Sequence, residues 1–286
     1  MIKKKDETQS IKVIVPEVVY EPSQGWIPFR LNELWAYHEL LYFLTWRDIK
    51  VRYKQAVLGV SWAIIQPFIA MVIFSVIFGK LAKLPSEGIP YAVFSYTALL
   101  PWQLFASALE RSGTSLVGNA NIMTKVYFPR LIIPLSAVGA SLVDFCLSFI
   151  VLIGLMLYYH IKVSWTIITL PLLILLALLT ALAVGIWLSA LNVQYRDVQH
   201  MIPFIIQAWL YASPVAYSSS LIPRGVWQFI YGLNPLAGVI QGFRWSLLST
   251  EPPNALFVVS IIIDILLFVS GIFYFKRVEK SFADVV

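Results

Sequence analysis

Long apolar runs constrain this chain more than any other feature of its sequence. Six runs of about 20 residues are helix length, whereas barrel strands would be about half as long and alternating. In lipid, only helices and closed barrels satisfy their backbone hydrogen bonds. Because 59% of the 286 residues are hydrophobic and only 13% are charged, the sequence predicts an all-α polytopic membrane protein. The six predicted transmembrane spans are residues 58–79, 91–110, 131–159, 165–191, 200–217 and 255–275.

The sequence before the first span has two parts. Residues 1–30 are polar, contain three prolines and lack the apolar core of a signal peptide, so we expect a loosely ordered cytoplasmic arm. Residues 31–56 have helical spacing, interfacial Trp and Tyr residues and a basic end, which predicts an amphipathic helix in the headgroup plane. A solvated helix of a soluble domain is the alternative. Residues 57–276 are the predicted transmembrane domain, and residues 277–286 are a cytoplasmic tail.

The basic residues favour one orientation. With the N-terminus inside, sixteen of the 21 lysines and arginines fall in cytoplasmic segments, as the positive-inside rule requires. Six spans then return the C-terminus to the cytoplasm. The same bias explains the formal net charge of +6 through membrane contacts, without nucleic acid as a partner.

Residues 218–254 are too broken by Pro and Gly for a simple span and too apolar for a free loop. Broken backbone at membrane depth survives only against protein or a water-lined cavity. We therefore expect short re-entrant helices between spans five and six, next to a transport pathway. An interfacial loop with an aromatic belt is the alternative.

The sequence contains no ATP-binding motif and no recognisable set of catalytic residues. It has no G-x-x-x-x-G-K-[S/T] motif to hold ATP phosphates and no cluster of ionisable groups suited to a membrane transferase. The single cysteine, Cys146, lies in an apolar run, and the three histidines are scattered, so no metal site is expected. We expect a transport subunit with no catalytic residue, cofactor or metal of its own.

Two carboxylates, Asp144 and Asp264, interrupt predicted spans. An intramembrane acid is costly and is a functional candidate by default. No basic partner for either acid is apparent within a span, which makes a proton relay less favoured than structural hydrogen bonding. Their protonation is left open by the sequence.

Two predicted cytoplasmic loops carry compact polar segments. Residues 111–130 connect spans two and three, and part of this loop has the composition of a short helix parallel to the membrane. Residues 192–198 connect spans four and five and contain the adjacent pair Arg196 and Asp197. Such a pair either docks a partner or caps its own helix, and the residues alone do not decide between these roles.

Five segments, in order, resemble one known family. They are RDIKVRYKQAVLGVSWAIIQP (47–67), KVYFPRLIIP (125–134), LNVQYRDV (191–198), SPVAY (213–217) and LNPLAGVIQGFR (233–244). Each is similar to a segment of the ABC-2 type permeases that export polysaccharides. The resemblance extends over roughly residues 33–250 and does not include the N-terminal arm.

This resemblance implies a half-transporter in the bacterial inner membrane. Two copies would pair around a channel, and two separate ATPase subunits would bind ATP and Mg and dock from the cytoplasm. The cargo would be a lipid-linked O-antigen, teichoic-acid-like or capsule polymer. Leu58 and Gly59 would lie at the cytoplasmic entrance. The residues implied in ATPase coupling are Asn119, Asn121, Lys125, Tyr127, Phe128, Arg130, Arg196 and Asp197.

Sugar rings stack on aromatic side chains, so a polysaccharide path is expected to be aromatic. The candidate channel-lining residues are Tyr96, Trp102, Phe105, Trp209 and Tyr211, although lipid-facing or belt packing explains each one equally well. A drug or small-lipid permease of the same superfamily is the alternative. A self-powered secondary transporter is less favoured, because the sequence shows no internal repeat and no intramembrane charge pairing.

Overall fold

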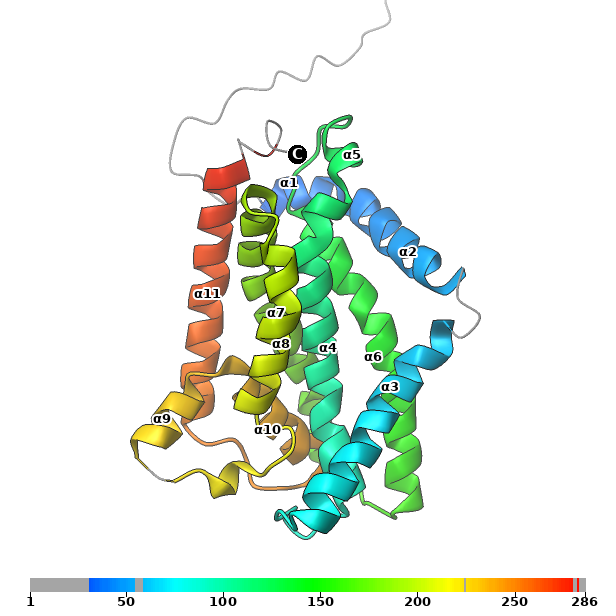
Figure 1. The fold of residues 1–286 in the computed structure, drawn as a ribbon, viewed down its shortest axis with the longest axis vertical. Helices are drawn as coiled ribbons and strands as arrows, with labels where there is room; N and C mark the ends of the chain where they lie inside the picture. Colours follow the sequence, from blue (N-terminus) through cyan, green and yellow to red (C-terminus); the bar gives the residue numbers. More distant parts are fainter. Residues whose placement is uncertain (1–30, 55–58, 224, 280–281, 283–286) are drawn as a thin grey trace, which may run out of the picture. The chain divides into compact units, whose positions relative to one another are not determined.

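The computed structural model describes residues 31–54, 59–223, 225–279 and 282, and these residues form helices without strands. The long helices run side by side, and short helices lie at both ends (Figure 1). In chain order the helices are α1 Leu31–Ala36, α2 His38–Lys54, α3 Gly59–Phe74, the π-helical η1 Ser75–Leu81, α4 Tyr91–Gly118, α5 Ala120–Met123, α6 Ile132–Tyr158, the 3-10 turn η2 Trp165–Thr169, α7 Leu170–Gln194, α8 Val198–Ala212, the turn η3 Ser219–Leu221, α9 Val226–Gly232, α10 Pro235–Leu248 and α11 Leu256–Val278.

Five described helical stretches are long and apolar enough to cross a membrane, and they correspond to predicted spans one, two, three, four and six. They are Ser61–Leu81, Tyr91–Gly118, Ile132–Tyr158, Trp165–Gln194 and Leu256–Val278. The predicted fifth span, residues 200–217, overlaps α8, which begins at Val198 and ends at Ala212 after 15 residues. A helix of this length spans about 22 Å, less than the roughly 30 Å of a hydrocarbon core. The prediction was therefore too long at this span.

Helix α4 lies at the centre of the bundle. Its most apolar window is 78% buried, against 39% or less in the other four candidate spans. It packs most extensively against α7 and α6, and also against α10, α3 and α8. The helix continues to Gly118 instead of ending at residue 110 as predicted. Its last turns carry small polar residues such as Ser112 and Ser115, which are buried against neighbouring helices rather than exposed in a loop.

Close approach between α4 and α7 depends on one glycine. A Cβ atom built on Gly185 of α7 would lie 1.9 Å from the Oγ atom and 2.9 Å from the Cβ atom of Ser112 in α4. Lipid tails are as apolar as the helices, so membrane helices associate largely through such close packing of small residues. A Cβ atom built on Gly154 of α6, by contrast, would have no atom within 4 Å.

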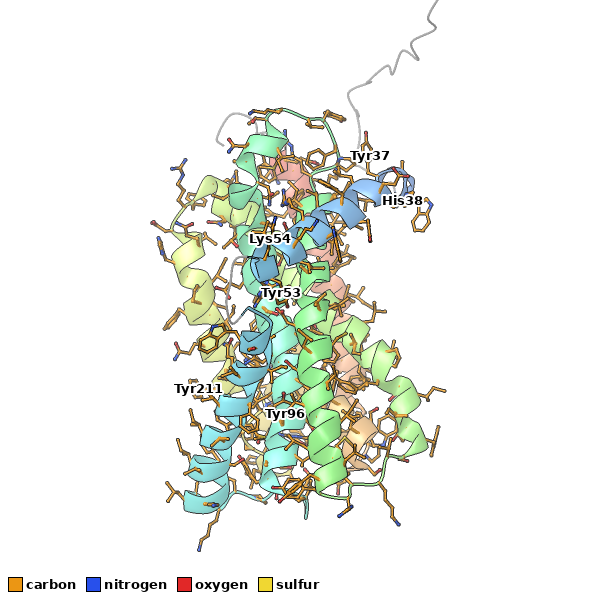
Figure 2. All side chains as sticks on the ribbon, turned by 90° about the vertical axis from the view of Figure 1, so that its right-hand side faces the viewer. Tyr37, His38, Tyr53, Lys54, Tyr96 and Tyr211 are labelled. Atoms are coloured by element: carbon orange, nitrogen blue, oxygen red, sulfur yellow. The ribbon has the colours of Figure 1, made fainter. Side chains whose placement is uncertain are left out.

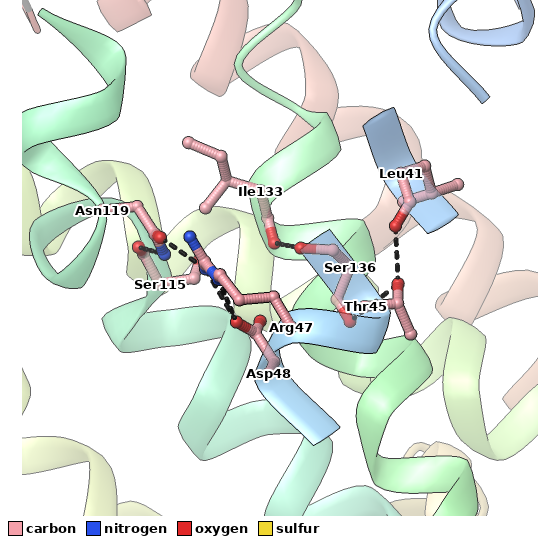
Figure 3. Close-up of polar contacts among 8 residues, drawn as sticks. All are labelled: Leu41, Thr45, Arg47, Asp48, Ser115, Asn119, Ile133 and Ser136. Atoms are coloured by element: carbon pink, nitrogen blue, oxygen red, sulfur yellow. Dashed lines mark hydrogen bonds and ion pairs between the residues drawn. The ribbon is translucent and has the colours of Figure 1, made fainter. Parts of the chain in front are cut away.

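The predicted helix at 31–56 forms as two helices. The break lies at Tyr37 between α1 and α2, and α2 ends at Lys54. Figure 2 shows α2 running obliquely beside the long helices, from His38 to Tyr53 and Lys54. Its buried Leu44 is the exception among mostly exposed side chains. The Thr45 hydroxyl binds the Ser136 carbonyl oxygen of α6 at 3.4 Å (Figure 3).

Helices α9 and α10 form in the segment for which short helices were predicted, and they lie at the end of the bundle opposite α5 (Figure 1). Asn234 caps α10, because its side-chain oxygen accepts a hydrogen bond from the Leu236 amide at 3.1 Å. Pro235 occupies the first turn, where its missing amide hydrogen costs nothing. Almost all of α10 is buried, against α4, α7 and α11.

The contact at Gly185 gives a test of this packing. We expect Gly185→Ala to destabilise the protein by about 1–3 kcal/mol, as overpacking of a filled interior does. Gly154→Ala is the matched control, because its added methyl group enters open space. Thermal unfolding in detergent, followed by tryptophan fluorescence, measures both variants. Equal melting temperatures for the two would contradict the close contact between α4 and α7.

Candidate functional site

Asn119 joins the predicted coupling loop to α2. Its side-chain oxygen accepts a hydrogen bond from Nη2 of Arg47 at 2.7 Å, and its Nδ2 donates to the Ser115 carbonyl oxygen at 2.8 Å (Figure 3). Arg47 also pairs with Asp48 at 2.7 Å. The amide therefore fixes the end of α4 against α2, and Arg47 belongs to this site although the sequence did not single it out.

The rest of the loop divides into exposed and anchored residues. Asn121, Lys125 and Tyr127 are exposed around the short helix α5, whereas Phe128 is buried. Arg130 is held by the end of α11, because its Nη1 donates to the Glu279 carbonyl oxygen at 2.5 Å. The loop therefore presents a polar and aromatic tip on a fixed base.

Arg196 and Asp197 lie in the short connection between α7 and α8, and both side chains are exposed. Asp197 precedes α8, yet its side chain makes no capping hydrogen bond. The described residues show no ion pair between the two. Of the two roles left open by the sequence, capping of α8 is therefore not made by the Asp197 side chain. Leu58 lies outside the described residues, and Gly59 is the first residue of α3.

The predicted coupling residues come together at one end of the bundle. The end of α4, α5, the connection between α7 and α8, and the end of α11 all lie there, together with α1 (Figure 1). Segments that are far apart in the sequence thus lie at the same end of the bundle, and we call their exposed polar residues the polar surface around α5.

Asp144 has basic partners, contrary to the prediction from sequence. Its Oδ2 atom lies 2.5 Å from Nη1 of Arg52 and 2.6 Å from Nη2 of Arg111, and the Tyr53 hydroxyl donates to Oδ1. Arg111 reaches it because α4 continues past residue 110. The other two partners come from α2. The expectation that neither intramembrane acid has a basic partner was therefore wrong for Asp144.

This cluster of Asp144, Arg52, Arg111 and Tyr53 connects α2, α4 and α6. Burial, and then the hydrogen bond to Asp144, raise the pKa of the Tyr53 hydroxyl, so it stays a donor at neutral pH. An ionised carboxylate with two guanidinium partners and one hydroxyl is satisfied without a transported ion. The arrangement thus supports a structural role for Asp144 and gives no support to a proton relay.

Asp264 is buried in α11 and accepts a hydrogen bond from the Thr180 hydroxyl of α7 at 3.1 Å. Its other oxygen has no hydrogen-bond partner among the described residues. The contact joins α7 to α11, two helices that pack extensively. The geometry therefore shows structural hydrogen bonding for the Oδ2 atom of Asp264, which is the role favoured from the sequence.

Three of the five candidate channel aromatics are in the protein core. Tyr96, Trp102 and Phe105 of α4 are buried, and the Tyr96 hydroxyl donates to the Ser148 carbonyl oxygen at 3.1 Å. Such side chains line no open surface of the described chain, so the structure gives no support to a channel role for them. Tyr211 is exposed on α8, where Figure 2 shows it at the side of the bundle.

Trp209 lies at an aromatic groove. Its Nε1 donates to the Asn234 side-chain oxygen at 2.9 Å. The groove has a volume of about 700 Å³ and is lined by Trp209, Tyr217, Trp227 and Tyr231, with apolar residues between them. Trp227 and Tyr231 belong to residues 218–254, which the sequence had placed beside a pathway, and Tyr217 directly precedes that segment.

Arg244 locks two of the motif segments together at this end. Its Nη2 and Nη1 atoms donate to the carbonyl oxygens of Val215 at 3.0 Å and Tyr217 at 3.1 Å. The guanidinium also lies 3.6 Å from the ring centroid of Phe94 in α4. Burial lowers the pKa of Arg244 to about 10, which still leaves it protonated at neutral pH.

The family model for the ABC-2 type transporter matches residues 39–248, from α2 to the last residue of α10. The chain belongs to this family. The match includes α5 and the connection between α7 and α8, the Asp144 cluster and the segments joined by Arg244, but not α11. An ABC-2 type permease is a transport subunit, and five apolar helices of membrane-spanning length agree with that assignment.

Curated relatives of this ABC-2 type chain include O-antigen export permeases and a polysialic acid transport protein. The O-antigen export system permease protein RfbA of Myxococcus xanthus is 29% identical over 255 residues, with 87% of this chain and 96% of the relative covered. RfbA of Klebsiella pneumoniae is 31% identical over 256 residues, with 87% and 95% covered. The polysialic acid transport protein KpsM of Escherichia coli is 27% identical over 200 residues, with 68% and 76% covered.

The Asp144 cluster generates a double-mutant test. We expect Asp144→Asn and Arg111→Gln each to lower stability by about 1–3 kcal/mol, because each leaves a partly buried polar group without its charged partner. The double variant should lose less than the sum, with a coupling energy of about 0.5–3 kcal/mol. Thermal unfolding of the purified protein measures this, and Asp197→Asn, at an exposed carboxylate, is the control. Additive losses would show that the two side chains do not interact.

Proposed function

We propose that this chain is the permease subunit of an ATP-driven exporter of lipid-linked polysaccharide of the O-antigen, teichoic-acid or capsule type. The observation that carries the proposal is the similarity to two O-antigen export permeases over 87% of the chain, at 29% and 31% identity. The cargo would pass from the cytoplasm across the bacterial inner membrane. The permease for a drug or small lipid is the alternative within the family.

The proposed assembly contains two copies of this chain and two ATPase subunits. ATP and Mg would be bound by those subunits, because the sequence has no phosphate-binding loop of its own. The polar surface around α5 is the proposed docking site for the ATPase. Its exposed Asn121, Lys125, Tyr127, Arg196 and Asp197 would contact that subunit, whereas Asn119, Phe128 and Arg130 would hold the loop in place.

We place the α5 end of the bundle in the cytoplasm. Most basic residues of the described chain lie on segments at that end, as the positive-inside rule requires. They are Arg47, Lys50, Arg52, Lys54, Arg111, Lys125, Arg130, Arg196, Lys276 and Arg277. Both termini would then be cytoplasmic.

The remaining elements fit this orientation. Helices α1 and α2 would lie at the membrane interface, where their exposed Trp35, Tyr42, Phe43 and Trp46 suit the headgroup region. The fifth of the six predicted spans would be made by α8 together with the non-helical residues 213–217 that follow it. Helices α9 and α10 would enter the outer leaflet and return.

For the path of the sugar chain, we propose Trp209 and Tyr211 of α8 with the aromatic groove beside them. Sugar rings stack weakly on aromatic faces, which allows a polymer to slide. The proposed entrance is at Leu58 and Gly59, where α2 leads into α3. The Asp144 cluster holds the end of α2 near this point.

The first test is the composition of the complex. The tagged chain, purified in mild detergent and weighed by native mass spectrometry, should carry an ATPase subunit in a two-plus-two assembly with ATPase activity. A chain that purifies without any ATPase, even after cross-linking in native membranes, would contradict the exporter assignment.

The docking surface has its own test. We expect Tyr127→Ala to weaken ATPase binding about tenfold, as loss of an interface aromatic does, and to lower export and ATP turnover while membrane insertion stays normal. Tyr158→Ala is the matched control. Tyr158 is 76% exposed and Tyr127 is 73% exposed, but Tyr158 is the last residue of α6, at the end of the bundle opposite α5. Equal effects of the two substitutions would rule out a specific role for α5 in coupling.

A further inference from the structure

A second cavity, of about 550 Å³, lies beside α10 and has a lining of mixed polar and apolar surface. Its polar side chains include Glu87, Ser219, Gln241, Arg244, Thr250 and Glu251. The volume falls within the range of small-molecule sites, about 300–1,000 Å³. These residues come from the connection before α4, from η3, from α10 and from the connection after it, all at the end of the bundle opposite α5 (Figure 1). We call this cavity the polar pocket.

Arg244 supplies the pocket with a buried donor. Only 3% of this residue is exposed, and both terminal nitrogens are occupied by carbonyl oxygens of residues 215 and 217. Its Nε atom has no hydrogen-bond partner among the described residues. Leaving a buried donor unpaired is costly, and an acceptor atom of a ligand in the pocket would remove that cost.

The rest of the pocket offers acceptors and hydroxyls. Glu87, Gln241 and Glu251 provide side-chain oxygens, and Ser219 and Thr250 provide hydroxyl groups. Glu87 is fixed in place, because one of its oxygens accepts a hydrogen bond from the buried Ser218 hydroxyl. Each hydroxyl group of a sugar ring is both a donor and an acceptor of hydrogen bonds. The carboxylate, amide and hydroxyl groups of the pocket offer such a ring the partners that it needs.

Two residues of the pocket have left-handed backbone conformations. Glu87 has φ of 55° and Ser249 has φ of 56°, and both line the cavity. Ser249 is the residue that ends α10, where a left-handed conformation is common. Glu87 lies in the connection before α4, so one rim of the pocket is a helix end and another is a strained connection.

The charged side chains that line the pocket restrict the chemical class of its ligand. Two carboxylates, Glu87 and Glu251, face the pocket with one guanidinium, Arg244. The surplus of negative charge disfavours a carboxylate or phosphate ligand and tolerates a neutral or amino group. We propose that the polar pocket binds a sugar unit that carries no negative charge. This inference rests on the proposed function, and it favours neutral or amino-sugar polymers as cargo over polymers rich in phosphate or acidic sugars.

The pocket also adjoins the aromatic groove. Segment 213–220 lines both cavities, with Tyr217 in the groove and Pro214, Ser219 and Ser220 in the polar pocket. Helix α10 contributes Pro235 to the groove and Gln241 to the polar pocket. A sugar chain that stacks in the groove would therefore have a hydrogen-bonding site next to it.

The test uses the purified full-length protein in nanodiscs, with N-acetylglucosamine, glucosamine and glucuronate as probes at equal concentration. Saturation-transfer difference NMR should show binding of the first two sugars, with glucuronate about two- to fivefold weaker, the effect of one partly exposed charge. Glu251→Gln should lower the affinity for glucosamine about two- to fivefold relative to N-acetylglucosamine. Gln241→Ala should weaken binding of both.

Glu110→Gln is the control, because Glu110 is exposed on α4 and does not line the pocket. Absence of saturation transfer from every sugar would overturn the proposal, as would equal signals from all three sugars in the wild type and both pocket variants. Binding of Ca²⁺ without any sugar would also overturn it. If any of these negative results is obtained while the ATPase complex is recovered, the pocket proposal fails and the exporter assignment stands. If sugars bind but no ATPase partner is found, the exporter assignment fails and the pocket proposal stands.

Discussion

The burial of α4 is the constraint on which the rest of the structure depends. Helices in lipid gain little from hiding apolar surface, so their association requires shape complementarity and polar contacts. Ser112 of α4 meets Gly185 of α7 closely enough that no side chain larger than hydrogen fits there. The same helix carries Phe94 beneath the Arg244 guanidinium near one end and Arg111 beside Asp144 towards the other. The positions of both polar sites are therefore set by one helix.

The Asp144 cluster shows how α2 is attached to this bundle. One carboxylate joins arginines from two helices, and the Tyr53 hydroxyl adds a further donor. Leaving any member unpaired near lipid would cost more than the same change in water. Together with the bond between Arg47 and Asn119, the cluster holds α2 at two points along its length. A displacement of α5 by a docked partner would therefore also move α2, which leads into the first span.

The sequence predicted the parts of this fold that depend on hydropathy alone. The five candidate spans follow from apolar runs, and the short helices α9 and α10 follow from apolar segments broken by Pro and Gly. The partners of Asp144 were missed, because the pairing depends on which faces of α4 and α6 meet and Arg111 was assigned to a loop. The burial of Tyr96 was missed for the same reason. Composition identifies an aromatic residue but not the neighbour that its helix face will contact.

Arg244 explains why two separated motif segments belong together. Its planar guanidinium reaches two carbonyl oxygens while stacking on Phe94, which the point charge of a lysine would not do. The bonds to Val215 and Tyr217 hold the chain just after α8 against α10. That stretch of backbone is also the wall between the aromatic groove and the polar pocket. The shapes of the two cavities are thus coupled, because any movement of α10 that frees Arg244 alters the stacking surface and the hydrogen-bonding surface at once.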